Sequence, residues 1–108
     1  MSSDSAYCMV LTTTSSAQEA RDLAGALLAE KLAACVQVQQ VSSHYVWQGQ
    51  VCDEPECLLL IKTRSDRYPA LEEFIAANHT YETPELVRVP ISAGSAAYLR
   101  WIDEATLI

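Results

Sequence analysis

Apolar and polar positions change period along the chain, and each period predicts a different element. Residues 7–11 are apolar on both faces, which is typical of a strand inside a sheet. From Cys35 the period changes to two, because Val36 and Val38 alternate with Gln37 and Gln39, which predicts a strand with one solvent-exposed face that continues to Trp47. The turn signal Gln48-Gly49-Gln50 predicts a hairpin into a further strand over residues 51–64. Residues 57–61 are continuously apolar, which places that strand at the sheet centre.

Apolar residues spaced three and four positions apart predict three helices. The first begins at a capping box, either Ser15 with Gln18 or Ser16 with Glu19, and carries an apolar stripe of Ala20, Leu23, Ala24, Leu27 and Leu28. The second opens within residues 65–69, ends at Asn78 and buries Leu71, Phe74 and Ile75. A fourth strand is predicted over residues 86–91, and a short last helix carries Tyr98, Trp101 and Ile102 on one face.

The order βαββαβ plus a terminal helix predicts an α+β fold of the ferredoxin-like, split βαβ type, with the first and third strands at the sheet centre. We expect one domain over residues 1–108, with residues 1–5 flexible. Pro55 predicts a bulge or an edge segment, because proline cannot donate to a strand ladder. The hairpin is long for a chain of 108 residues and exposes Tyr45 and Trp47, which predicts oligomerisation through it.

Composition removes several classes of function. The chain is 50% hydrophobic, enough for one core, and its net charge of −7 argues against binding to nucleic acid or to an anionic membrane. The three glycines are too far apart for the common nucleotide-binding loops, and the four cysteines form no CxxC pair of a structural zinc finger. We see no membrane span and no secretory signal at the start of the chain, so we expect a cytoplasmic protein.

Three other roles of this fold lack their residues. An RNA-recognition module needs aromatic side chains on its third strand, and residues 57–61 have none. The loop over residues 12–17 lacks the CxxC of a copper chaperone and the arginine of an acylphosphatase-like site.

Several multi-residue motifs then occur in order, namely residues 29–36 (AEKLAACV), 45–49 (YVWQG), 60–63 (LIKT), 79–86 (HTYETPEL) and 98–101 (YLRW). Through them, residues 7 to 102 resemble the CutA family of divalent-cation tolerance proteins. The resemblance implies a cytoplasmic, non-enzymatic homotrimer with the architecture of the PII signalling proteins and a role in tolerance of copper and other divalent metal ions. Thr80 stands where the family usually has a proline, so one fixed φ angle of this loop is absent.

His79 is the best candidate metal ligand, because an imidazole with carboxylates nearby can bind Cu²⁺ or Zn²⁺. Glu82 and Glu85 are its possible carboxylate partners. Proposed copper sites in the resembling family use a cysteine at the end of the first strand and two consecutive histidines. The matching positions here are Thr12, Asn78 and His79, so Thr12 and Asn78 are weaker candidates.

Two alternatives remain open beside the metal site. The expected cleft residues are Cys35, Trp47, Lys62, Tyr81 and Glu82, and a PII-like sensor would bind a small anionic ligand there through Lys62. An enzyme using Lys62, Tyr81 and Glu82 as acid and base has less support, because no nucleophile–base pair can be named. More simply, Lys62 pairs with Glu82 or Glu85 at a strand end and Cys35 is a small buried residue.

Overall fold

The computed structural model describes residues 5–108, which form a four-stranded sheet with three helices. The strands are β1 (Tyr7–Thr14), β2 (Cys35–Trp47), β3 (Gln50–Arg64) and β4 (Val87–Pro90). The helices are α1 (Ala17–Ala29), α2 (Tyr68–Asn78), preceded by the 3₁₀ turn η1 (Ser65–Arg67), and α3 (Ala96–Ala105). Apart from Ser5, the N-terminal residues expected to be flexible lie outside the described part of the chain.

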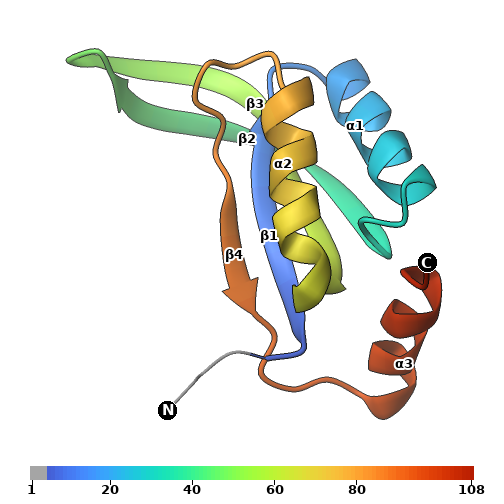
Figure 1. Cartoon of the computed structure of the whole chain (residues 1–108). Coiled ribbons are helices and arrows are strands. Elements are labelled where there is room, and N and C mark those ends of the chain that lie inside the picture. Colours follow the sequence, from blue (N-terminus) through green and yellow to red (C-terminus); the bar gives the residue numbers. More distant parts are fainter. Residues whose placement is uncertain (1–4) are drawn as a thin grey trace.

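The strand order in the sheet is β2-β3-β1-β4, and every neighbouring pair is antiparallel. This order confirms the ferredoxin-like α+β prediction, with β1 and β3 at the centre and β4 at one edge. Helices α1 and α2 lie on one face of the sheet (Figure 1). No helix within residues 5–108 has both the length and the apolar character needed to cross a membrane.

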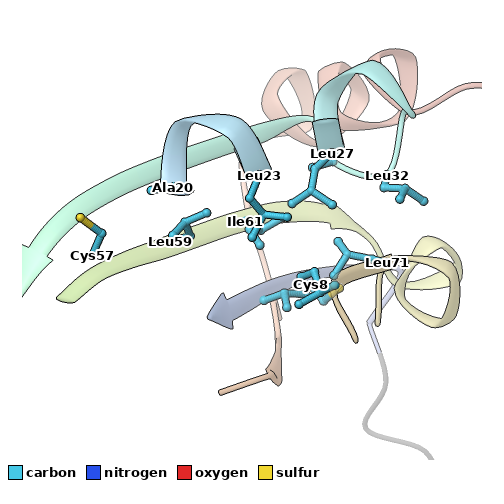
Figure 2. Close-up of a cluster of buried hydrophobic side chains, with 12 residues drawn as sticks. Cys8, Ala20, Leu23, Leu27, Leu32, Cys57, Leu59, Ile61 and Leu71 are labelled. Atoms are coloured by element: carbon cyan, nitrogen blue, oxygen red, sulfur yellow. The ribbon is translucent and has the colours of Figure 1, made fainter. Parts of the chain in front are cut away.

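The side of the sheet that faces α1 and α2 carries the main core. Figure 2 shows Leu23 and Leu27 reaching from α1 toward Leu59 and Ile61 of β3. The centre of this cluster is excluded from solvent, and its fully buried members include Val10, Leu27, Leu59, Ile61, Leu71 and Ile75. The predicted cap of α1 is the second of the two alternatives, because the Ser16 side chain accepts the Glu19 backbone N–H.

Strand β1 is longer than the apolar run that predicted it. It continues to Thr14, which pairs with Cys57, and the three threonines at its end are buried. The loop predicted from residue 12 is therefore wrong over residues 12–14. Threonine is β-branched and fits a pleated strand, so pairing with β3 outweighs the polar side chains.

The β2–β3 hairpin extends beyond the rest of the sheet at the upper left of Figure 1. Its ladder runs without a register shift from Cys35 opposite Lys62 to Trp47 opposite Gln50. The first alternative for Pro55, a bulge, is therefore wrong. The second, an edge segment, is confirmed, because β1 ends opposite Cys57 and no strand pairs with β3 on that side at Pro55 within the described residues.

The opposite sheet face is apolar but mostly uncovered. Strand alternation places six side chains on it, namely Met9, Leu11, Leu58, Leu60, Val87 and Val89, and all six retain solvent exposure. Helix α3 covers one end, where Tyr7 Oη donates to Asp103 at 2.8 Å and Arg64 Nε donates to Thr106 Oγ1 at 2.9 Å. Ile102 is buried, but Tyr98 and Trp101 of the predicted apolar helix face stay exposed.

The hairpin turn and helix α1 offer a matched pair of glycine substitutions. Gly49 has φ +77° next to Gln48 at φ 52°, a left-handed turn that suits the twist of the strands. Gly25 lies inside α1, and at either glycine a Cβ would meet no atom within 4 Å. We expect Gly49→Ala to lower the free energy of unfolding by about 1 kcal/mol and Gly25→Ala to raise it by about 0.5–1 kcal/mol.

Chemical denaturation of both variants beside the wild type measures this difference. A Gly49→Ala variant as stable as the wild type would contradict the assigned turn conformation. A Gly25→Ala variant that loses stability would contradict the open position of Gly25.

Candidate functional site

A cleft with a volume of about 810 Å³ lies between the outer part of the hairpin and the loop after α2. It forms where β1 ends at Thr14 while β2 and β3 continue. Residues of β1, the hairpin and the loop line it, namely Thr13, Ser43, His44, Tyr45, Trp47, Glu54, Glu56 and residues 80–85. The volume is in the range of small-molecule sites and far exceeds that of a bare ion.

His79 holds the loop after α2 in place, immediately before the loop residues that line the cleft. Its Nε2 lies 2.6 Å from the carbonyl oxygen of Thr13, and its Nδ1 accepts the Tyr81 backbone N–H at 3.0 Å. Because Nδ1 accepts a hydrogen bond, a neutral ring must carry its hydrogen on Nε2, from which it donates to the Thr13 carbonyl. Both ring nitrogens are therefore engaged within the chain, and binding a metal would require the imidazole to give up one of these bonds.

Thr80 ties the same loop to the first turn of α1. Its Oγ1 donates to Glu19 Oε2 at 2.6 Å, while the backbone N–H and the hydroxyl of Ser15 both donate to Glu19 Oε1. Burial raises the pKa of Glu19, but these hydrogen bonds outweigh it, so the net pKa is below its ordinary value. At this position, where the resembling family usually has proline, a hydrogen bond restrains the loop.

Two tyrosine–glutamate pairs line the cleft. Tyr81 Oη donates to Glu56 Oε2 at 2.6 Å, and Tyr45 Oη donates to Glu54 Oε1. Glu56 is only 8% exposed, whereas Tyr45 and Glu54 lie in solvent. Burial and then the bond to Glu56 raise the pKa of Tyr81, and the bond to Glu54 is the main reason the pKa of Tyr45 rises to about 12.

The lining is strongly acidic. Glu54, Glu56, Glu82 and Glu85 contribute carboxylates, and no lysine or arginine takes part. Within residues 5–108 no cationic side chain lies within ion-pair distance of Glu56, so its charge is buried without a counter-ion. Carboxylates attract cations, so this lining favours a positively charged ligand.

The predicted metal ligands are separated by the fold. Thr12 is fully buried on the helix side of the sheet, and its hydroxyl has no hydrogen-bond partner. Asn78 is exposed and donates to the carbonyl of Phe74 at 2.8 Å. Glu82 and Glu85 line the cleft, but no group of three potential metal ligands gathers anywhere in the described residues.

The expected cleft residues also divide into two groups. Trp47, Tyr81 and Glu82 line the cleft. Cys35 and Lys62 pair with each other near the opposite end of the β2–β3 ladder. There Lys62 Nζ donates to Gln37 Oε1 at 2.7 Å and lies 5.9 Å from the centre of the Tyr98 ring, so it pairs with neither Glu82 nor Glu85.

The site residues predicted from the sequence include neither Glu54 nor Glu56, although both line the cleft. One signal was available: Glu56 continues the alternate positions of Leu60 and Leu58 along β3, so a carboxylate follows two apolar residues on one face. That Tyr81 would lie against it could not be read from the sequence, because 25 positions separate the two residues.

Comparison with known proteins gives a consistent result over nearly the whole chain. A family model described as CutA1 divalent ion tolerance protein matches residues 8–105. The chain is 46% identical over 99 residues to the divalent-cation tolerance protein CutA of Thermus thermophilus, covering 91% of this chain and 96% of that protein. A solved CutA1 structure from Shewanella sp. SIB1 aligns with a TM-score of 0.91 and 38% identity, over 95% of this chain and 97% of that one.

Plant relatives are longer. The chain is 41% identical to the chloroplastic CutA 1 protein of rice over 91% of its own residues, but spans only 56% of that protein. The shared part is therefore the ferredoxin-like domain described above.

The two tyrosine–glutamate pairs differ in burial and allow a controlled test. We expect Tyr81→Phe to lower the free energy of unfolding by about 1 kcal/mol, the low end for a buried acceptor left without its donor, because Tyr81 itself is only partly buried. Tyr45→Phe should change stability far less, because water replaces the lost donor. Thermal unfolding of both variants measures this contrast, and equal losses would contradict the burial of Glu56.

Because the pKa of Tyr45 is raised in the folded state, we expect the protein to lose stability at high pH. Its folded pKa of about 12 lies above the ordinary value of 10.0, so the stabilisation is complete below pH 10 and is lost as the pH rises through 12. The ultraviolet difference spectrum between the wild type and Tyr45→Phe reports this ionisation. Glu54→Gln should shift it back toward the ordinary value, and an unchanged titration would exclude the bond to Glu54 as its cause.

Proposed function

The chain belongs to the CutA1 divalent ion tolerance family, and from this premise we propose that it acts as a homotrimer that binds divalent metal cations in its acidic cleft. The single observation that carries the proposal is the charge of the cleft. Four glutamates line it, one of them is buried with no counter-ion among residues 5–108, and the lining contains no lysine or arginine.

The proposed self-association rests on the uncovered sheet face. A continuous apolar surface formed by three strands is unfavourable in water, and α3 shields only one end of it. The projecting hairpin adds exposed apolar side chains, with Val46 at 70% and Val51 at 82% exposure. Packing copies of this face together would bury both features and place the cleft beside a subunit boundary.

We propose that the metal site is completed by more than one subunit. Hard and borderline divalent cations take carboxylate ligands, and Glu82 and Glu85 are free to turn toward a neighbour because they are exposed on the cleft loop. One chain alone gathers no set of three ligands among its described residues. We retain His79 as a ligand candidate for Cu²⁺ or Zn²⁺ only in a state in which its bond to Thr13 or Tyr81 is broken.

The proposed role is binding without catalysis. The phenols of Tyr45 and Tyr81 donate to carboxylates that help to raise their pKa values, so neither phenol is suited to act as a base near neutral pH. We also propose a cytoplasmic location, because all four cysteines are free thiols, as is usual in a reducing compartment.

A PII-like sensor for a small anionic ligand is the second candidate, and no observation favours it. Lys62, the cation expected to hold the anion, lies away from the cleft beside Gln37 and Tyr98. An anion entering the cleft would meet four carboxylates.

Calorimetric titration of the metal-stripped protein with Cu²⁺ and Zn²⁺ tests the proposal. We expect binding that weakens roughly tenfold or more in the double variant Glu82→Gln/Glu85→Gln, because two ligand charges are lost. Glu72→Gln/Glu73→Gln, two exposed changes on α2 outside the cleft, should leave the affinity unchanged and removes the same number of charges. Light scattering of each variant should give the mass of a trimer.

Three outcomes would contradict the proposal. Absence of metal binding by an intact trimer would exclude the metal role. Metal affinity that falls equally in the cleft variant and in Glu72→Gln/Glu73→Gln would mean that ions gather on the acidic surface without a site. A large loss in His79→Ala, with the cleft variant unaffected, would move the site to the imidazole.

A further inference from the structure

Three consecutive residues of the loop after α2 are each held by a different element. His79 is bonded to the end of β1, and Tyr81 is bonded to β3. Thr80 lies between them and is bonded to α1, because its Oγ1 donates to Glu19 Oε2 at 2.6 Å. The loop enters the cleft at this point, since residues 80–85 all belong to the lining. The three bonds therefore set the place from which the rest of the loop runs along the cleft.

Glu19 connects this loop to the start of α1. Its Oε1 accepts the backbone N–H and the hydroxyl of Ser15, at 3.1 and 3.0 Å, while its Oε2 accepts the Thr80 hydroxyl. The Glu19 backbone N–H in turn donates to Oγ of Ser16, the N-terminal cap of α1. A carboxylate bonded through both oxygens is restricted in its rotamers, so the loop is tied to a fixed point on the helix.

The bond from Thr80 is a specific contact with the charged form of Glu19. Burial raises the pKa of Glu19, and among the interactions that lower it the bond from Thr80 has the largest effect. The net pKa is below its ordinary value, so the carboxylate is ionised at neutral pH. Hydrogen bonds to an ionised acceptor are stronger than those between neutral groups, and this one is short.

We propose that Glu19 is a positioning residue for the cleft. It acts through Thr80 to fix the loop, so that the carboxylates of Glu82 and Glu85 keep their places for a bound cation. The inference deepens the proposed function, because it rests on the same cleft taking divalent cations and names a residue of α1, outside the lining, that controls its affinity. Glu19 is not itself a ligand, and its effect passes along the loop.

Amide hydrogen exchange of the metal-free oligomer tests the positioning by itself. The Tyr81 N–H donates to His79 Nδ1, so its exchange rate reports local opening of the loop. We expect Thr80→Val to speed this exchange roughly threefold to tenfold, because the isosteric change removes the donor to Glu19. Thr80→Ser keeps the hydroxyl and should restore the wild-type rate. The amide of Leu59, in the core, should exchange at the wild-type rate in both variants.

Ser15→Ala is the matched control. It removes a hydrogen bond to the other oxygen of the same carboxylate and leaves the bond from Thr80 in place. A double variant places the effect at Glu19, because Thr80→Val should add nothing in a Glu19→Ala background, where its acceptor is already absent. Light scattering and circular dichroism confirm that each variant is folded and oligomeric, and Thr80→Ala takes the place of Thr80→Val if that variant does not fold.

Calorimetric titration of the same variants with Zn²⁺ separates this inference from the proposed function. We expect the affinity to fall roughly threefold to tenfold in Thr80→Val and to keep its wild-type value in Thr80→Ser and Ser15→Ala. If the wild type binds Zn²⁺ and Thr80→Val binds it equally well, the positioning role fails while the proposed metal role stands. If no variant binds Zn²⁺ but Tyr81 exchange responds as expected, the metal role fails and the positioning of the loop by Glu19 is supported.

Two results of the exchange experiment would also overturn the inference. One is an unchanged Tyr81 exchange rate in Thr80→Val. The other is an equal acceleration in Thr80→Val and Ser15→Ala, which would mean that any loss of bonding at Glu19 loosens the start of α1 without a specific link to the loop.

Discussion

The point at which β1 stops pairing with β3 governs the rest of this structure. Pairing ends with Thr14 opposite Cys57, while β3 continues outward to Gln50 with β2 as its only paired strand among residues 5–108. The outer hairpin is thus a two-stranded ribbon, a form that has little stability alone unless its faces are covered. Pro55 is tolerated there because the strand has become an edge. The space left beside the ribbon is the cleft.

The loop after α2 converts this space into a defined site. His79 uses both ring nitrogens, one on the Thr13 carbonyl at the end of β1 and one on the Tyr81 backbone N–H. Thr80 adds a bond to Glu19 on α1. The loop is therefore held by β1 and by the first helix, and it presents Tyr81 to Glu56. A residue that looked like a metal ligand serves in this state to position the wall of an acidic, aromatic cleft.

Two features of the single chain are energetically unfavourable, and both favour the binding of another molecule. One sheet face is apolar with little cover, and one carboxylate is buried with no counter-ion in the described residues. Association of subunits would remove the first, and a cationic ligand would remove the second. Both lie on the same side of the fold, where the sheet face runs outward along the hairpin, so assembly and ligand binding are expected to be linked.

The sequence by itself determined the order of elements, the central strands and the hairpin turn, because each depends on local periodicity or local backbone preference. It also identified Trp47, Tyr81 and Glu82 as residues of one region. Only the tertiary structure decided that β1 extends through three threonines, that Lys62 lies away from the cleft, and that His79 is engaged at both nitrogens. These outcomes depend on strand register and on contacts between residues such as Thr13 and His79, 66 positions apart, which no local pattern encodes.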